Sequence, residues 1–368
     1  MNPGLKEWIW FANLKGITTR KKVELLRIFN DPAEIYRADA IELARTGILN
    51  RDNITSILSS EYRDTVDGTI EEIYKNHMDV VTLTSSNYPE LLKNICDPPV
   101  CLYVKGKLRA DELSVAVVGS RRASGYGITV AKKISGELAL CNICIVSGMA
   151  RGIDTAAHMG ALSVKGRTIA VLGCGLDRVY PPENKKMMEQ IIEYGAVISE
   201  YPPGAEPAPH HFPVRNRIVS GMSVGVLVVE AGERSGSLIT AQLALEQGRD
   251  VYALPGNVIS VNSKGTNKLI QDGAKLVTSV QDILDELHWY ECFGMKSVLD
   301  FESERKSKLN IDTDEKSVIE LLSLESLHID EIQKKLSISM PLLHSILLSL
   351  EMKGLIKLEP GGRYSIQI

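Results

Sequence analysis

The sequence has no long hydrophobic run. No segment approaches the roughly 18 uninterrupted apolar residues that a membrane-spanning helix needs. The first residues, MNPGLKEWIW, also lack the pattern of a secretory signal, because charged side chains interrupt the apolar stretch. Neither sign of charge is in large excess: 42 basic and 46 acidic residues give a net charge of −4, which excludes a wholly electropositive surface but not a local basic patch. We therefore expect a cytoplasmic protein with no membrane partner.

Cysteine is scarce, and no metal-binding spacing is present. The six cysteines among 368 residues lie mostly in apolar runs, which predicts reduced thiols in the core: Cys96, Cys101, Cys141, Cys144, Cys174 and Cys292. His210 and His211 do not make a metal site, because adjacent histidines cannot easily face one ion and no Cys or acid stands at ligand spacing. A Walker A motif is missing as well. We expect no metal, no other cofactor and no ATP hydrolysis.

What the sequence does contain is a division into segments of different patterning. Residues 1–78 carry apolar residues at helical spacing and predict a small helical domain. Residues 79–290 alternate short apolar runs with helical stretches, which is the pattern of an α/β domain. Residues 291–314 are charged and aperiodic, which predicts a linker before a further domain at 315–368. The balance of charge is +1 over residues 87–290, against −2 before and −3 after, so a polyanion site is expected in the middle segment.

The middle segment predicts a Rossmann-like, doubly wound parallel sheet. Near-continuous apolar runs suit strands that are covered on both faces. The candidate strands are Val115–Val118, Ile143–Val146, Thr168–Leu172, Ala196–Ile198, Val224–Val229 and Val251–Leu254. In the common strand order 3-2-1-4-5-6, the first and fourth strands flank the crevice at the carboxyl edge where ligands bind. The loop that begins at Arg121 would then face the loop 212–217.

Two glycine-rich turns at this edge suit a phosphate. Gly119, Ser120 and Arg121 follow the first strand, where a helix start offers free N–H groups and the arginine adds a forked cation. The turn from Gly148 to Gly152 repeats the arrangement one strand further on. The alternative, a tight turn with solvated arginines, stays open for each motif alone. A dinucleotide is not favoured, because GSRRASGYG is not G-x-G-x-x-G and the second strand does not end in an acid.

The segment from Phe212 to Arg217, FPVRNR, combines an aromatic ring with arginine and asparagine at a loop-to-helix junction. A flat ring beside phosphate donors is what single-stranded nucleic acid uses. The alternative is that Phe212 fills the core and the arginines pair with local acids such as Glu200 or Glu230. Both interpretations remain open at this point.

Taken together, the motifs resemble the DNA-processing protein family DprA, also called Smf. They run in family order from Tyr88 to Val277 and are YPELLKNICDPPVCLYVKG, AVVGSRRASGYG, VSGMARGIDTAAHMGAL, LGCGLDRVYPPEN, SEYPPG, HFPVRNRIVSGMS, VVEAGERSGSLITAQLALEQGRDVYALPG and GTNKLIQDGA. The resemblance implies a non-enzymatic recombination mediator that binds single-stranded DNA. Such proteins protect incoming strands during natural transformation and load the recombinase RecA while displacing single-strand binding protein.

The resemblance also implies roles for individual residues. Gly119, Ser120 and Arg121 would hold phosphate, Gly148 would be a position of close approach, and Phe212 would stack on a base. The remaining implied contacts are Arg215, Asn216 and Arg217 as polar groups and Lys185 and Lys264 as rim cations. The family dimerises through its late α/β region, which points to Leu269, Ile270 and Leu276.

One enzymatic alternative is a nucleotide-processing hydrolase of the lysine-decarboxylase-like type, which has a similar sheet. The nearest counterpart of its G-G-x-G-T-x-x-E loop is Gly232–Thr240. No acid follows Gly236 and Ser237 until Glu246, so the carboxylate that such enzymes use is not in place. The sequence therefore favours a binding protein over this enzyme.

The terminal segments match known units less specifically. Leu14–Ile17 and the following helix are like a helix-hairpin-helix or sterile-alpha-motif unit, with a basic run at residues 20–22. This domain is net acidic, which favours an accessory or packing role. The last segment looks like a winged helix, with its helix-turn-helix at Ile329–Leu336 and Met340–Lys353 and its wing tip at Gly361-Gly362. Since its second helix has only His344 and Lys353 as cations, we expect a protein contact or regulatory module rather than a duplex reader.

Overall fold

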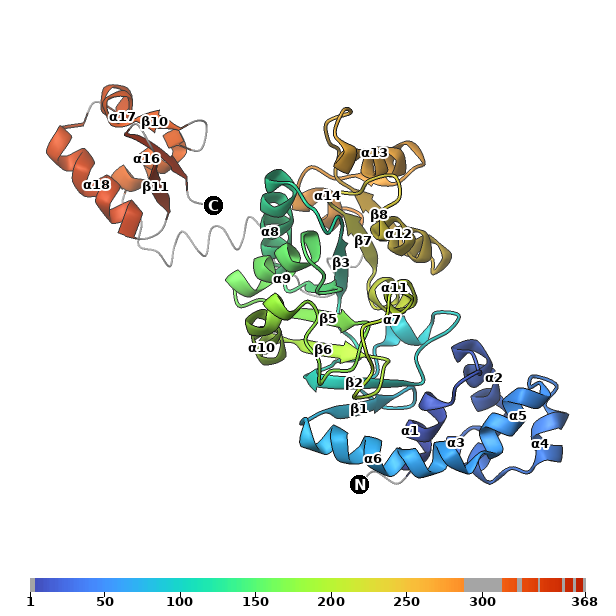
Figure 1. The fold of residues 1–368 in the computed structure, drawn as a ribbon. Helices are drawn as coiled ribbons and strands as arrows, with labels where there is room; N and C mark the ends of the chain where they lie inside the picture. The colour runs from blue at the N-terminus through green and yellow to red at the C-terminus, as the bar shows by residue number, and fades with distance from the viewer. Residues whose placement is uncertain are drawn as a thin grey trace. The chain divides into compact units, whose positions relative to one another are not determined.

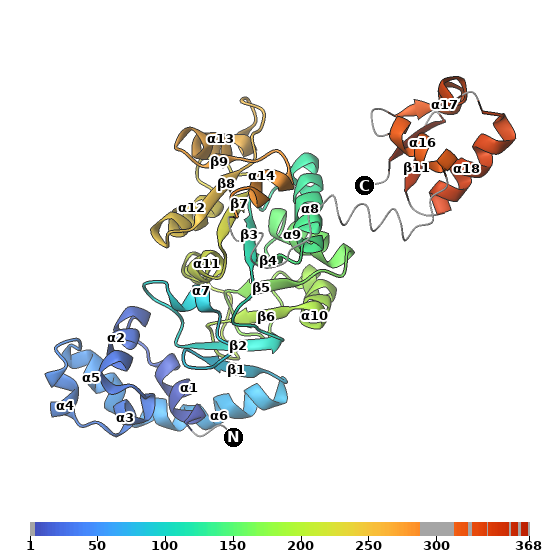
Figure 2. The same cartoon turned by 180° about the vertical axis from the view of Figure 1, so that it is seen from behind.

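A computed structural model describes residues 4–287, 313–322, 326–336, 338–352, 355–359 and 362–366. The chain divides into two compact units, Met1–Met295 and Lys296–Ile368, and each is described by itself. Figures 1 and 2 show the first unit as a broad sheet with helices on both faces and the second as a small bundle with a hairpin. The predicted linker at 291–314 lies outside the described residues, except for its last two.

Six helices open the first unit. They are α1 (Leu5–Asn13), α2 (Thr19–Phe29), α3 (Pro32–Arg37), α4 (Ala40–Arg45), α5 (Arg51–Leu58) and α6 (Ser60–Lys75). Local sequence sets their starts: the Thr18 hydroxyl accepts from the N–H of Lys21, and Asp39 forms a capping box with Glu42. The helical prediction for residues 1–78 is confirmed, and the first strand begins at Asp79.

The sequence predicted a separate helical domain at residues 1–78, but these helices share a hydrophobic core with the sheet. Their buried side chains, Trp10 and Phe11 among them, form one hydrophobic cluster with the sheet residues Tyr103 and Val197. The three residues of the predicted basic run, 20–22, also do not share one environment. Lys22 is buried and donates to the carbonyl of Ala12 at 2.5 Å, because it lies on the side of α2 that also buries Leu25.

The sheet has nine strands in the order β1-β2-β6-β5-β4-β3-β7-β8-β9. The strands are β1 (Asp79–Thr82), β2 (Cys101–Gly106), β3 (Ser114–Val118), β4 (Cys144–Ser147), β5 (Thr168–Leu172), β6 (Ala196–Ser199), β7 (Gly225–Val228), β8 (Asp250–Ala253) and β9 (Lys275–Leu276). β2 pairs antiparallel with both β1 and β6, and the other pairings from β6 to β9 are parallel. The mostly parallel, doubly wound core is as predicted.

The strand order differs from the predicted one. The fourth core strand, β6, pairs with β5 through Ile169 and Ala196, so the order of the six core strands is 4-3-2-1-5-6. The direction of winding therefore reverses between β3 and β7, not between the first and fourth strands. The strands β2 and β1 then extend the sheet beyond β6 as an antiparallel pair.

Helices cover both faces of the sheet. α8 (Gly125–Leu140), α9 (Ile153–Ser163) and α10 (Lys185–Tyr194) lie on one face, and α11 (His211–Gly221) and α12 (Gly236–Glu246) lie on the other (Figure 1). Shorter elements complete the unit: α7 (Glu90–Lys93), η1 (Pro182–Asn184), η2 (Val261–Ser263), α13 (Lys264–Gln271) and α14 (Val280–Leu284). The long connection α11 carries the chain from β6 past β5, β4 and β3 to β7, which brings its first turn over the carboxyl edge.

The cysteines mostly follow the prediction. Cys101, Cys141, Cys144 and Cys174 are free and buried. Cys96 is free but exposed, so it is not a core thiol, because it follows the short helix α7 in a surface turn. Cys292 lies outside the described residues.

The second unit has the helix and strand order of a winged helix. Its elements are α16 (Thr313–Leu322), β10 (Leu327–His328), α17 (Ile329–Leu336), α18 (Met340–Met352), β11 (Ile356–Glu359) and β12 (Arg363–Ile366). The three strands form a sheet in the order β10-β12-β11, and the helices enclose a core that includes Val318, Leu343 and Leu350. The two predicted helices are present. Gly362 lies between β11 and β12 with φ +73°, as a turn glycine does, whereas Gly361 and Lys353 lie outside the described residues.

Candidate functional site

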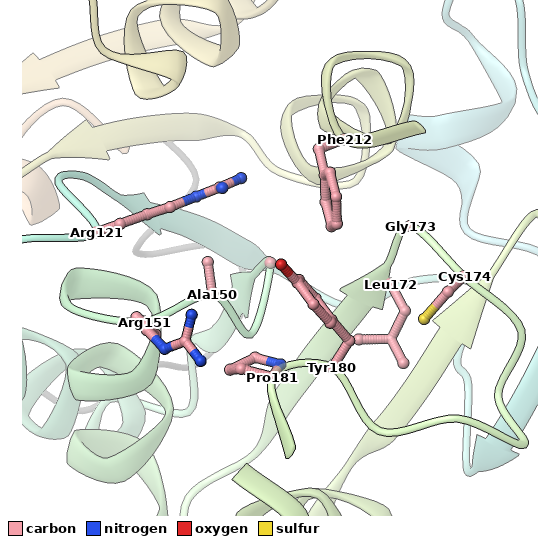
Figure 3. A pocket seen from close by; sticks show the side chains of 10 residues that line it. Arg121, Ala150, Arg151, Leu172, Gly173, Cys174, Tyr180, Pro181 and Phe212 are labelled. Atoms are coloured by element: carbon pink, nitrogen blue, oxygen red, sulfur yellow. The ribbon is translucent and has the colours of Figure 1, made fainter. Parts of the chain in front are cut away.

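A small pocket opens at the carboxyl edge of the sheet, where the loops after β3, β4 and β5 meet the first turn of α11. Figure 3 shows the side chains that line it, and they are Arg121, Gly148, Ala150, Arg151, Leu172, Gly173, Cys174, Tyr180, Pro181 and Phe212. Its volume is about 20 Å³, too little to enclose a planar base. A ligand as large as a planar base would rest on the rim of the pocket, so the rim side chains matter most for binding.

The first glycine turn packs tightly against the neighbouring segments of the chain. A Cβ at Gly119 would stand 2.6 Å from Cγ1 of Ile153, so only glycine fits between the first two turns. The N–H of Ser120 donates to the carbonyl of Glu230 at 2.7 Å, and the carbonyl of Ser120 accepts from Ile153 at 3.2 Å. The backbone N–H of Ser120 is therefore occupied, which corrects the expectation that it points outward as a free phosphate donor. The side chain of Arg121 is exposed beside it.

Glu230, at the end of β7, positions the same loop. Its buried carboxylate accepts from the N–H of Ser124 at 2.9 Å and from the Ser124 hydroxyl at 2.5 Å. The Ser124 hydroxyl in turn caps α8 by accepting from the N–H of Gly127. The sequence had suggested Glu230 as a partner for the arginines, but it is engaged with the Arg121 loop backbone instead.

The second glycine turn is shaped around an arginine of the protein itself. A Cβ at Gly148 would stand 2.5 Å from Nη2 of Arg215, so the close approach predicted for Gly148 is made by the Arg215 guanidinium. Met149 follows with φ +56°, an uncommon conformation for a residue with a side chain. Asp154 holds the turn by accepting from the N–H of Ala150 at 3.3 Å, and burial raises the pKa of this carboxyl to about 6.

Arg215 and Arg217 are both buried, at 3% and 5% exposed. Nη1 of Arg215 donates to the carbonyl of Gly148 at 2.8 Å and to that of Val171. Burial lowers the pKa of Arg215. Arg215 still contributes to the pocket electrostatically, because its guanidinium carbon lies 5.9 Å from the centre of the Phe212 ring.

Arg217 pairs with acids, which is the alternative that the sequence left open. Its Nη2 lies 2.6 Å from Oε1 of Glu200 and its Nε lies 3.0 Å from Oδ2 of Asp97. This pairing and its burial remove Arg217 from the set of free cations, contrary to the role that the resemblance implied. Asn216 is half-buried, and its amide reaches the carbonyl of Gly236 at 3.4 Å.

Phe212 and Arg121 do meet. The guanidinium carbon of Arg121 lies 5.3 Å from the centre of the Phe212 ring, within the range of a cation–π contact. Phe212 packs over Gly173, where a Cβ would stand 3.1 Å from the ring, and Tyr180 lies beside it with ring centres 5.5 Å apart. Figure 3 shows Arg121, Phe212 and Tyr180 converging from three different segments.

Sequence reasoning missed Tyr180 as a site residue and left Arg151 out of the implied contacts. Tyr180 is half-buried in the loop after β5, and only the tertiary fold brings it beside Phe212. Arg151 is exposed and forms a bidentate pair with Glu183. The signal for both was available as the motif VYPPEN and the second glycine turn, but nothing local joined them to Phe212.

The other predicted residues lie away from this cluster. Lys185 is exposed at the first position of α10, and Lys264, at the first position of α13, lies 3.4 Å from Glu233. Leu269 and Ile270 are half-buried on α13, and Leu276 is 43% exposed on the edge strand β9. Leu276 therefore lies at the β9 end of the sheet.

The described residues contain no cluster of three or more His, Cys, Asp or Glu able to hold a metal ion. Within the same residues, no helix is long and apolar enough to cross a bilayer. At the loop that corresponds to the hydrolase alternative, Ser235 caps α12 by accepting from Ser237. The nearby carboxylate of Glu230 is committed to Ser124, so the hydrolase alternative gains no support.

Fold and site together define a doubly wound α/β binding protein with an arginine and aromatic rim, joined to a winged-helix unit. Residues 79–288 match the family described as DNA recombination-mediator protein A, and residues 302–362 match the DprA winged helix domain. The chain belongs to this family, known as DprA or Smf.

Individual relatives agree with this assignment. Protein Smf of Escherichia coli is 36% identical over 360 residues, covering 96% of this chain and 94% of that protein. The crystal structure of DprA from Streptococcus pneumoniae is similar with a TM-score of 0.67 and 39% identity, covering 76% of this chain and 97% of that one. A structure concerned with the single-stranded DNA binding mode of DprA from Helicobacter pylori is similar with a TM-score of 0.51 and 32% identity, covering 58% and 97%.

Proposed function

We propose that this DNA-processing recombination mediator binds single-stranded DNA on the rim of the pocket formed by Arg121, Phe212 and Tyr180. The observation that carries the proposal is the exposed Arg121 guanidinium over the Phe212 ring. A base can stack on an aromatic face while its phosphate pairs with the adjacent arginine, and neither contact depends on sequence. The binding mode studied for the Helicobacter pylori relative supports a single strand as the ligand.

The pocket selects an unpaired strand by geometry. Because stacking on the Phe212 ring needs a free base face, a base must leave its own stack to contact Phe212. In a duplex, that base would have to unpair at a cost of a few kcal/mol. Binding should therefore be stronger for single strands than for duplexes.

Arg121 and its neighbour Arg122 provide the test. Both side chains are exposed, but the guanidinium of Arg121 lies over the Phe212 ring, whereas the backbone carbonyl of Arg122 accepts from Asn262. Arg121→Ala should lower the affinity for an oligo-dT strand by roughly thirty-fold, the equivalent of about 2 kcal/mol for a charge-assisted hydrogen bond. Arg122→Ala is the matched control and should stay within about threefold.

The measurement is fluorescence anisotropy at several salt concentrations, with thermal unfolding of both variants as a check on folding. The slope of log affinity against log salt should fall by about 0.7 in the Arg121 variant, as expected for one lost phosphate contact on a single strand. Equal binding by the Arg121 variant, the Arg122 variant and the parent would contradict the proposed site.

The cellular role that the family resemblance implies extends this proposal. A binder that tracks the backbone of unpaired DNA could protect incoming strands during natural transformation and hand them to RecA in place of single-strand binding protein, without catalysis and in the cytoplasm. The support is the family membership. The test is RecA filament assembly on a strand covered by single-strand binding protein, which the parent should accelerate and the Arg121 variant should not.

A homodimer is proposed through the end of the sheet that carries Leu269, Ile270 and Leu276. Leu276 lies on a two-residue edge strand and is 43% exposed, so its backbone and side chain are both open to a second copy. Leu276→Arg should convert a dimer to a monomer in sedimentation velocity. A chain that is monomeric before the substitution would refute this part.

A further inference from the structure

A second, much larger cavity lies between the N-terminal helices and the sheet. Its volume is about 590 Å³, within the range of about 300–1,000 Å³ typical of small-molecule sites. One side is formed by α1, α2 and α6, and the other by β2, the loop after β6 and the start of α11. The N-terminal helices therefore complete a hollow that the sheet alone would leave open.

This cavity adjoins the pocket of Arg121 through one helical turn. Phe212 lines the first pocket, while its neighbours His211 and Val214 line the cavity. The His211 ring stacks on the Tyr201 ring with centres 4.0 Å apart, and Nδ1 of His211 lies 3.1 Å from the carbonyl of Gly173. The first turn of α11 thus separates two aromatic positions, one on each side.

The charges of the cavity cancel. Lys15 and Lys22 line it together with Glu61 and Glu200. Lys22 already donates to the carbonyl of Ala12, and Glu200 already pairs with Arg217 at 2.6 Å. A phosphate would gain little from this balanced set, whereas a neutral, polar group would not be repelled.

The remaining lining suits a planar group with hydrogen-bonding edges. Tyr62 and Tyr201 offer flat rings. The hydroxyls of Thr65 and Thr69 donate to helix carbonyls at 3.2 Å, which leaves their oxygen lone pairs as acceptors. A nucleobase combines a flat face with a polar edge, and it is uncharged.

We propose that this cavity takes up a second unpaired base of the bound strand, stacked against Tyr201, with the sugar–phosphate chain running from the Arg121 side across the first turn of α11 to the cavity. The inference rests on the proposed function, because the strand must first be held at Phe212. It assigns the N-terminal helices a direct part in DNA binding, instead of packing alone.

The test fills the cavity from its helical wall. Thr65 lines the cavity on α6 and is exposed at the surface, so Thr65→Trp can occupy the space without replacing a core residue. Thr55→Trp is the matched control, because Thr55 is also an exposed helical threonine that donates to a preceding carbonyl, and it does not line the cavity. Tyr201→Leu is a second route, which removes the flat ring and leaves the space.

Binding of oligo-dT strands from about 4 to about 16 nucleotides, the range of site sizes for such grooves, is measured by anisotropy. Thr65→Trp and Tyr201→Leu should each weaken binding of the longer strands by about ten-fold, as expected for one lost stacked base, with little effect on the shortest. Thr55→Trp should match the parent at every length. Thermal unfolding identifies any variant that fails to fold, and the other variant then decides.

The outcomes separate the two proposals. If Arg121→Ala weakens binding of every length but both cavity variants bind like the parent, the cavity inference is wrong and the proposed function stands. If the Arg121 variant also binds like the parent, the proposed function itself fails. If thymidine monophosphate alone is bound in a way that Thr65→Trp abolishes, while long strands bind that variant normally, the cavity serves free nucleotides and the inference is overturned.

Discussion

The two units of this protein have folds that both occur in nucleic-acid-binding proteins, yet they present different chemistry. The carboxyl edge of the α/β sheet exposes Arg121 and Arg122 and places an arginine over an aromatic ring. Helix α18 of the winged helix, at the position of a recognition helix, has the sequence MPLLHSILLSLEM and carries neither Lys nor Arg. Its exposed side chains include Leu342 at 43% and Leu348 at 60%.

This difference shows that the fold alone does not assign the DNA site. A phosphate backbone is held by cations and by stacking surfaces, and a leucine face has neither. This contrast is the reason why the DNA site is proposed on the α/β unit and a protein contact is proposed for the winged helix. Four substitutions can break or sharpen this contrast.

The largest effect is expected from a buried arginine of the α/β unit. Arg217→Ala leaves Glu200 and Asp97 without their partner. Breaking the ion pair with Glu200, whose side chain is 19% exposed, typically costs about 3 kcal/mol in the free energy of unfolding, whereas the pair with Asp97, 40% exposed, adds less. Urea denaturation measures it, with Arg122→Ala as the surface control. An unchanged unfolding midpoint would show that the buried Arg217 stabilises the fold no more than an exposed arginine does.

The stacking face gives the next largest effect. Phe212→Leu keeps an apolar side chain over Gly173 but removes the aromatic ring, so the affinity for oligo-dT should fall by about ten-fold, the equivalent of 1–2 kcal/mol for one stacked base. Anisotropy at fixed salt is the measurement. If this variant binds like the parent, the carboxyl edge of the α/β sheet binds DNA through charge and not through stacking.

A smaller effect concerns pH. The pKa of Asp154 is raised by burial to about 6, above the ordinary value of 3.8, so the folded state binds a proton more tightly than the unfolded state does. The contribution of this carboxyl to stability is thus greatest below pH 4 and is lost as the pH rises through 6. The difference in unfolding free energy between the parent and Asp154→Asn should shift in favour of the parent as the pH is lowered from 7 to 4. A difference that stays constant with pH would contradict this assignment.

The smallest effect is expected in the winged helix. Lys357 lies on β11 and pairs with Glu359 at 3.4 Å. Lys357→Ala should leave the affinity for single-stranded DNA within about twofold, because an exposed ion pair in an acidic unit adds little to phosphate binding. A drop comparable to that of the Arg121 variant would place a second DNA contact on this unit and end the contrast.

Much of the fold was predictable because its determinants are local. The core strands and the helices α17 and α18 follow from hydrophobic periodicity, which reflects burial on one or both faces. The sequence places the glycines of the first turn correctly, at the carboxyl edge of the sheet. Phosphate binding, however, is not the full reason for them. Gly119 is needed because Ile153 packs against it, a contact between residues far apart in the sequence.

Other features could not be predicted. Whether an arginine in FPVRNR faces solvent or an acid depends on where Asp97 and Glu200 come to lie, and these come from other loops. The strand order likewise depends on the pairing of β6 with β5, which no local pattern encodes. The role of Tyr180 required the placement of its loop beside α11.

The amino-acid sequence by itself determined the alternation of strands and helices, the motifs of the family and the carboxyl-edge loops that carry them, because these depend on residues close together in the chain. Only the tertiary structure decided which arginines are exposed, that the N-terminal helices share a core with the sheet, and that Arg121 stands over Phe212. Those outcomes depend on which distant side chains compete for the same buried space and charge, and that competition is settled only when the chain is packed.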